Sequence, residues 1–404
     1  MKDRTKIIWS AVIALGFLLF SYWVTNLHFP ISGERAVLYR FELLRNYLWP
    51  RENVAPDSIL LIDISFDKTF ITAYDDYGLP IGQTPITDRQ KLLQLLLELK
   101  SRDDYRYVLL DVFFGQNSET PQDSALFETI KSMKRIILPC HRDEPLADVA
   151  LYDKAGLAEY TTTFSEVGFV KYPYLMDTIA SMPLKMYEEM TGRSVHKHGF
   201  IYTDGWKLVR KSIVLTYDVN VSEPYDDSGQ KNWYYLGADI LGDENQQGIL
   251  WIMPELTKNK YIVIGAFQGD DIHSTYLGDV AGPIINFNAY LSLLNGHHAV
   301  SLTLLIVLYI AFFVLAYLTL TRQNLHDLTT GIVNRKPKRF IVFISMLCTW
   351  IGYSLFLLIL CLTTYLILGE VYDIFITSTL FYLLHLAVKY TDNLKQLSKS
   401  WLKK

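Results

Sequence analysis

Cysteine is scarce in this sequence, and its scarcity excludes a fold held together by disulfides. The 404 residues contain three cysteines, and two of them, Cys348 and Cys361, fall inside a long apolar stretch. Small secreted domains that depend on disulfides are much denser in cysteine. Hydrophobic packing must therefore hold the soluble part of the chain together, and Cys140 is interpreted as a buried small apolar residue rather than a nucleophile.

Charge is also scarce, at 20% of the residues against about 25% in globular proteins. The hydrophobic fraction of 50% and the aromatic fraction of 14% exclude a disordered chain or a nucleic-acid-binding tail. The missing charge is confined to long apolar runs, for which we predict four transmembrane helices, because about 20 apolar residues cross a bilayer and lipid strongly favours helix. These runs are residues 7–25, 300–321, 340–368 and 371–388.

Basic residues flank the predicted spans and predict their orientation. Lys2, Arg4 and Lys6 precede the first span, and the loop 322–339 and the tail 389–404 are rich in lysine and arginine. By the positive-inside rule these segments and both termini are cytoplasmic in a multi-pass protein of the cell (inner) membrane. No clear cleavage site follows the first span, so it is interpreted as an anchor rather than a signal peptide.

The charge differs in sign between the membrane part and the segment 28–299. Outside this segment there are 13 Lys and Arg against 5 Asp and Glu, and inside it 25 against 37. The predicted organisation is a stub with the first span (1–27), an acidic extracytoplasmic domain (28–299), a second span (300–321), a basic cytoplasmic loop (322–339), a third and a fourth span (340–368, 371–388) and a basic tail (389–404).

The extracytoplasmic domain is predicted to be α/β, with a mainly parallel sheet. Short apolar runs alternate with segments of helical periodicity, which is typical of crossover units, while the stretch 150–255 is less regular. The predicted strands are 58–63, 107–114, 135–139 and 260–265, and the predicted helices are 34–48, one with a capping box at 87–90, one opening at 120–121, and one from 283 to about 294.

Acidic residues follow three of the four predicted strands. They are Asp63, Asp111, and Asp270 and Asp271 with His273 close behind. Ligands of parallel sheets bind beyond the carboxyl ends of the strands, so these side chains would form a ligand-binding rim if the strands are neighbours. The alternative is that each aspartate caps a helix or fixes a loop.

No known catalytic or cofactor motif occurs in the chain. A nucleophile elbow, an HExxH pair and a P-loop are all missing, and Gly265 is interpreted as a turn residue rather than part of a dinucleotide fingerprint. We therefore expect no catalytic residues, no metal site and no cofactor.

Several segments in order resemble the extracellular sensory domain CHASE, second type, of bacterial signalling receptors. The resemblance covers most of residues 34–298. It rests on the helix at 34–41, the segments 60–63, 86–92, 110–114, 136–139 and 261–265, and the helix containing Asn288-Ala289 and Asn295-Gly296. The family usually has His-Ala where this chain has Asn288-Ala289, and Asn288 joins the candidate rim. The resemblance implies a sensor followed by three spans.

Three functions are consistent with these features. The first is a receptor that senses an unidentified extracytoplasmic ligand and, since only 389–404 follows the last predicted span, signals through a cytoplasmic or membrane effector in trans. The second is a docking subunit of a membrane complex without a small-molecule ligand. The third is a metal-dependent hydrolase using Asp63, Asp111, Asp270, Asp271 and His273. The sequence is compatible with a homodimer, and no nucleic-acid partner is expected.

Overall fold

Two compact units make up the chain in the computed structural model. The first contains Met1–Leu27, Lys197–Arg210 and Ala299–Lys404, and the second contains His28–His196 and Lys211–His298. The residues that the structure describes are 3–26, 34–49, 56–74, 77, 79–116, 120–159, 171–176, 179–242, 253–269, 271–275, 278–321, 339–372 and 374–401. The segment Lys197–Arg210 thus groups with the long helices near both ends of the chain.

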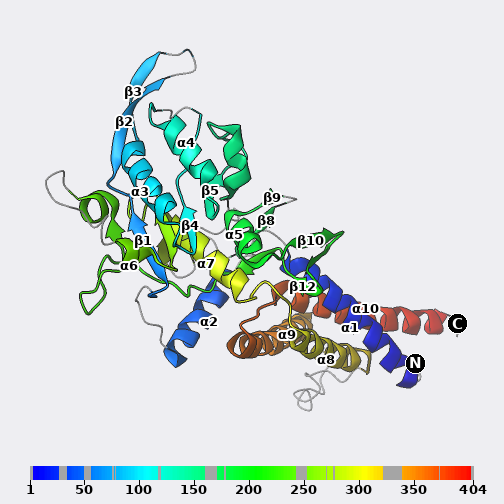
Figure 1. Ribbon diagram of the computed structural model, residues 1–404. Helices are drawn as coiled ribbons and strands as arrows, with labels where there is room; N and C mark the ends of the chain where they lie inside the picture. The colour runs from blue at the N-terminus through cyan, green and yellow to red at the C-terminus, as the bar shows by residue number, and fades with distance from the viewer. Residues whose placement is uncertain are drawn as a thin grey trace. The chain divides into compact units, whose positions relative to one another are not determined.

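A six-stranded sheet forms the centre of the second unit (Figure 1). Its order is β14 (Tyr234–Tyr235), β1 (Ile59–Asp63), β15 (Tyr261–Gly265), β4 (Tyr107–Leu110), β5 (Ile136–Cys140) and β6 (Ala155–Leu157), and all recorded pairings are parallel. The residues of β1, β4, β5 and β15 are all buried, as expected of parallel strands covered on both faces. The predicted mainly parallel sheet is confirmed.

One face of the sheet is covered by α3 (Arg89–Arg102) and α4 (Asp123–Ser132). Leu92, Leu95 and Leu96 of α3 are 0% exposed and pack in one core with Ile262 and Ile264. The cap of α3 differs from the predicted one. Asp88 caps the helix, accepting hydrogen bonds from the backbone N–H groups of residues 90 and 91 at 3.0 and 3.1 Å, because Thr87 is the last residue of β3.

The opposite face of the sheet is covered by α7 (Gly282–Leu294), which α5 (Met182–Thr191) contacts in turn. Successive side chains of a strand point to opposite faces, so Tyr261 points away from the α3 and α4 core. Its ring packs edge-on against Phe287 at 5.6 Å, and its hydroxyl bonds Tyr290 at 2.8 Å. Pro283 in the first turn of α7 matches the predicted start of this helix.

The second unit also contains α2 and several small elements. Their bounds are α2 Glu34–Leu48, β2 Lys68–Tyr74, β3 Pro80–Thr87, η1 Val149–Lys154, β7 Lys171–Pro173, β8 Leu175–Met176, β9 Ile179–Ala180, β13 Ser212–Val214, η2 Leu236–Leu241, α6 Met253–Thr257, β16 Ile272–Thr275 and β17 Gly278–Ala281. The strand β10 (Val195–His198) contains residues of both units. The antiparallel hairpins β2–β3 and β16–β17 were not predicted, and both contribute residues to the cavity described below.

Four long helices belong to the first unit: α1 (Asp3–Thr25), α8 (Leu302–Thr321), α9 (Arg339–Leu368) and α10 (Phe375–Trp401). In the described part of the chain, three apolar stretches are long enough to cross a membrane: 3–25, 302–321 and 349–368. The apolar part of α10, Ile376–Val388, is shorter. The structure therefore supports three candidate spans, and the predicted count of four is not confirmed.

A small hairpin in the first unit is fixed to the long helices of that unit. It consists of β11 (Ile201–Asp204) and β12 (Lys207–Val209). The hydroxyl of Tyr22 on α1 donates to the carbonyl of Val209 at 2.8 Å and accepts from the N–H of Tyr202 at 3.1 Å. Directly after the hairpin, Arg210 pairs with Glu370 at 2.7 Å, and both side chains are 8% exposed. The hairpin is thus fastened to α1 and to the turn between α9 and α10.

Candidate functional site

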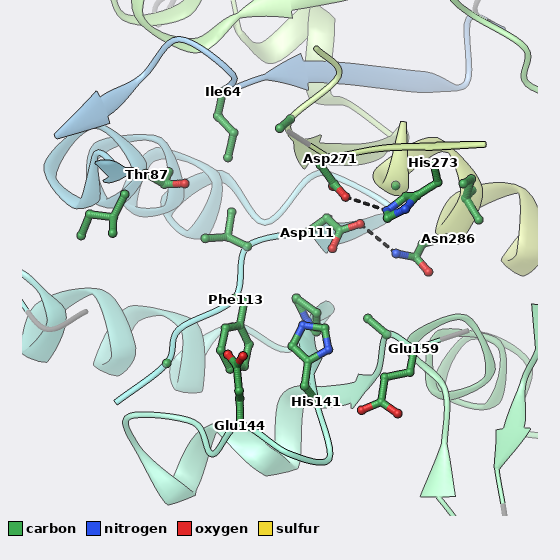
Figure 2. A pocket seen from close by; sticks show the side chains of 18 of the residues that line it. Ile64, Thr87, Asp111, Phe113, His141, Glu144, Glu159, Asp271, His273 and Asn286 are labelled. Carbon is green, nitrogen blue, oxygen red and sulfur yellow. Dashed lines mark hydrogen bonds and ion pairs between the residues drawn. The ribbon is translucent and has the colours of Figure 1, made fainter. Parts of the chain in front are cut away.

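A cavity of about 790 Å³ lies beyond the carboxyl ends of the strands in the second unit (Figure 2). Ile64 follows β1, Asp111 follows β4, and Pro139 and His141 lie at the end of β5. Parallel sheets bind their ligands at this edge, because the loops there are free to diverge while the strands hold their ends in register. The cavity therefore lies where the sequence predicted a ligand-binding rim.

Asp111 is the central polar residue of the cavity. Its N–H donates to the carbonyl of Ile264 at 2.7 Å, which extends the pairing of β4 with β15 by one residue. The side-chain amide of Asn286 on α7 donates to Asp111 Oδ2 at 2.8 Å, and Tyr172 donates its hydroxyl proton to Asn286 Oδ1 at 2.7 Å. A chain of hydrogen bonds thus fixes the Asp111 carboxyl group in the cavity wall.

The electrostatic surroundings of Asp111 oppose its ionisation. Burial, and secondly the nearby Asp271 carboxylate, raise the pKa of Asp111 from an ordinary 3.8 to about 7, while the Asn286 hydrogen bond and His273 act in the opposite direction. The side chain therefore exchanges between its neutral and charged forms near neutral pH.

Asp271 and His273 lie beside Asp111 in Figure 2 and come from the start of the β16–β17 hairpin. His273 Nε2 lies 2.9 Å from Asp271 Oδ1. A methyl group on Gly282 would lie 2.6 Å from both carboxylate oxygens of Asp271, so only glycine at the start of α7 leaves room for this carboxylate. The structure thus brings together three of the predicted site residues: Asp111, Asp271 and His273.

Two predicted site residues lie outside the cavity lining. Asp63 is 0% exposed, and its Oδ1 accepts the N–H groups of Ser65 at 2.8 Å and Phe267 at 3.1 Å, so it fixes two loops. Asn288 is also 0% exposed and bonds both backbone groups of Val219, at 2.9 and 2.7 Å. Asp270 lies outside the described residues.

Arg89 lines the cavity and was not singled out from the sequence. It is 3% exposed, its guanidinium carbon lies 4.4 Å from the centre of the Phe114 ring, and Nε lies 3.7 Å from Asp123 Oδ1. Burial lowers the pKa of Arg89, and Asp123 partly offsets that effect. A signal was available, because residues 89, 92, 96 and 99 share one helical face, so Arg89 is a cation on an otherwise leucine-lined face.

Metal ligation finds no support in the described residues, where no group of three His, Cys, Asp or Glu side chains is arranged to hold an ion. The Asp271–His273 pair supplies two such groups on one hairpin, and structural and catalytic zinc sites need three or four protein ligands. The hypothesis of a metal-dependent hydrolase therefore gains nothing from this geometry.

The comparison with protein families identifies the family of the chain. The model of the CHASE2 domain matches residues 14–320. The chain belongs to the CHASE2 domain family. CHASE2 domains form a family of extracellular sensory domains rather than enzymes, and the resemblance seen in the sequence is confirmed. Searches among curated proteins and among solved structures gave no match.

Proposed function

We propose that the protein is a membrane-anchored receptor whose CHASE2 domain binds a small molecule in the cavity outside the cytoplasm. The observation that carries the proposal is the cavity itself. It has the position expected for a ligand site on a parallel sheet, and its volume of about 790 Å³ falls in the usual range for small-molecule pockets of about 300–1,000 Å³. The wall combines apolar residues with a few polar groups, which fix a ligand's orientation.

The direction of signalling is part of the same proposal. Basic residues flank the spans, which supports placing both termini and the loop 322–339 in the cytoplasm and residues 28–299 outside it. The proposed output is a contact between these cytoplasmic segments and an effector protein in trans. Most of that loop, 322–338, lies outside the described residues.

If the protein were instead a docking subunit without a small-molecule ligand, the rim of the sheet would be closed and dry, and its acidic side chains would all be paired. The cavity is instead open, and Asp111 lines it with a pKa raised to about 7. Burying such a group against a protein partner would be unfavourable unless the partner supplied a matching polar group. The open cavity therefore favours a soluble ligand.

A ligand screen tests the receptor proposal. The melting temperature of the full chain in lipid nanodiscs is measured in the presence of each member of a library of polar metabolites and short peptides. We expect at least one compound to raise the melting temperature of the wild type, because a ligand that binds only the folded state stabilises it by mass action.

Two variants assign any stabilising compound to the cavity. Asp111→Asn removes the central carboxylate and is expected to abolish most of the shift, whereas Asp143→Asn changes an exposed aspartate outside the cavity lining and is expected to preserve it. The proposal fails if nothing stabilises the wild type, or if every active compound acts equally on wild type and Asp111→Asn.

A further inference from the structure

Arg89 lines the cavity with a guanidinium group whose hydrogen bonding is incomplete. Its Nη1 is buried and has no hydrogen-bond partner among the described residues. Its ion-pair partner Asp123, at 3.7 Å, already accepts hydrogen bonds from the N–H of Thr120 at 2.9 Å and from its hydroxyl at 3.0 Å. A buried guanidinium with open donors is costly unless a ligand completes its bonding, and its planar fork fits a carboxylate.

Asp111 brings an unused anionic acceptor to the same cavity. Asn286 occupies Oδ2, and no hydrogen bond reaches Oδ1 in the part of the chain that the structure describes. The neighbouring Asp271 makes a second negative charge unfavourable without a cation. A ligand ammonium group would supply three donors and the missing positive charge.

The two groups lie at different places along the cavity wall. Arg89 packs on the Phe114 ring and pairs with Asp123, whereas the Asp111 carboxylate is held by Asn286 of α7. Figure 2 shows Asp111 next to Asp271. The wall also contains the apolar side chains of Ile64, Val112 and Ile285. A ligand that satisfies both charges must carry them at separate positions on one small framework.

We propose that the cavity binds a small zwitterion, an amino acid or short peptide, whose carboxylate is held by Arg89 and whose ammonium group is held by Asp111. This inference rests on the proposed receptor function and names its ligand class. Both contacts are charge-assisted, and removing either one weakens binding roughly 10- to 100-fold.

The test uses calorimetric titration of the full chain in nanodiscs with the twenty amino acids and a set of dipeptides. The tightest binder is compared with its N-acetyl and its C-amide forms. With the wild type, each modification is expected to lower the affinity at least tenfold, because each one removes one of the two charges. The control Arg106→Gln, an exposed arginine outside the cavity lining, is expected to behave as the wild type.

Two variants assign each charge to its residue. In Asp111→Asn, N-acetylation is expected to cost less than threefold while amidation keeps its full effect. In Arg89→Gln, amidation is expected to cost less than threefold while N-acetylation keeps its full effect. The effect that each variant retains also shows that its cavity is folded, so loss of discrimination is not mistaken for loss of structure.

The zwitterion inference is overturned if no amino acid or dipeptide binds, or if the acetylated and amidated forms bind as tightly as the parent compound. A compound from the general screen that depends on Asp111 but lacks one of the two charges would refute the ligand class and leave the receptor proposal standing. If no compound depends on Asp111, both proposals fail.

Discussion

Replacing Asp111 with asparagine is expected to raise the stability of the full chain at pH 8 and to leave it nearly unchanged at pH 4. Burial and the Asp271 carboxylate raise the pKa of Asp111 to about 7, so its charge is unfavourable in the folded state. Asparagine has almost the same shape and can still accept the hydrogen bond from Asn286 through its side-chain oxygen. The substitution therefore removes the charge without removing the contact.

The direction of this pH dependence follows from proton binding at Asp111. Between the ordinary pKa of 3.8 and the folded pKa of about 7, the folded chain binds a proton at Asp111 that the unfolded chain has released. Stability from this residue is fully present below about pH 4, falls as the pH rises through 7, and stays low above it. The variant should gain on the order of 4 kcal/mol at pH 8, since the pKa rises by about three units and each unit corresponds to about 1.4 kcal/mol.

Thermal unfolding of wild type and variant between pH 4 and pH 8 measures this difference. Asp271, His273 and Tyr172 also face Asp111, so the difference curve, rather than either curve alone, reports the Asp111 charge. Asp143→Asn is the control, and its difference in stability from the wild type is expected not to change with pH. A difference independent of pH, or a loss of stability at pH 8, would contradict the electrostatic account.

Replacing Gly265 with alanine is expected to destabilise the second unit by about 3 kcal/mol, at the upper end of overpacking effects. A methyl group there would lie 3.0 Å from Pro283 Cβ and 3.1 Å from Asp111 Cβ, and it would press most closely on Pro283 Cγ. The interpretation of Gly265 as a turn residue is wrong, because Gly265 is the last residue of β15 and pairs in register with Asp63 of β1. Glycine is needed because the first turn of α7 packs directly on the end of β15.

The Gly265→Ala prediction has a second readout in ligand binding. Moving Pro283 or Asp111 would displace the cavity wall, so affinity for any cavity ligand should fall along with the melting temperature. Gly16→Ala is the control, because a methyl group at Gly16 in α1 meets no atom within 4 Å. An unchanged melting temperature for Gly265→Ala would show that the packing at this point is looser than described.

The parallel sheet could be predicted because its strands are continuous apolar runs. Tyr261–Gly265 and Ile136–Cys140 are buried along their whole length, and apolar runs as short as these fit buried strands better than helices, which usually need ten or more residues. The β2–β3 hairpin could not be predicted, because β3 is largely exposed and shows no alternation of apolar and polar residues. Its place is set by antiparallel pairing with β2, including Lys68 with Thr87.

The candidate site could be located from the sequence but not resolved residue by residue. Asp63 and Asp111 both follow buried strands, yet only Asp111 lines the cavity. The difference lies in the following residues, because Ser65 offers an N–H and a hydroxyl to Asp63, a common local arrangement for aspartate. Asn286 gave no signal in the sequence, since only the packing of α7 against β4 and β15 brings it to Asp111.

A receptor of this kind must transmit binding in the cavity to its membrane helices. Amide hydrogen exchange tests this transmission most directly. It is measured on the full chain in nanodiscs, with and without the tightest-binding amino acid or dipeptide. The account predicts slower exchange at the cavity segments 109–116 and 271–287, together with a changed exchange rate in the β11–β12 hairpin, which Tyr22 and the Arg210–Glu370 pair fasten to the membrane helices. Protection confined to the cavity, with the hairpin unchanged, would contradict a receptor and indicate a binding protein without transmembrane output.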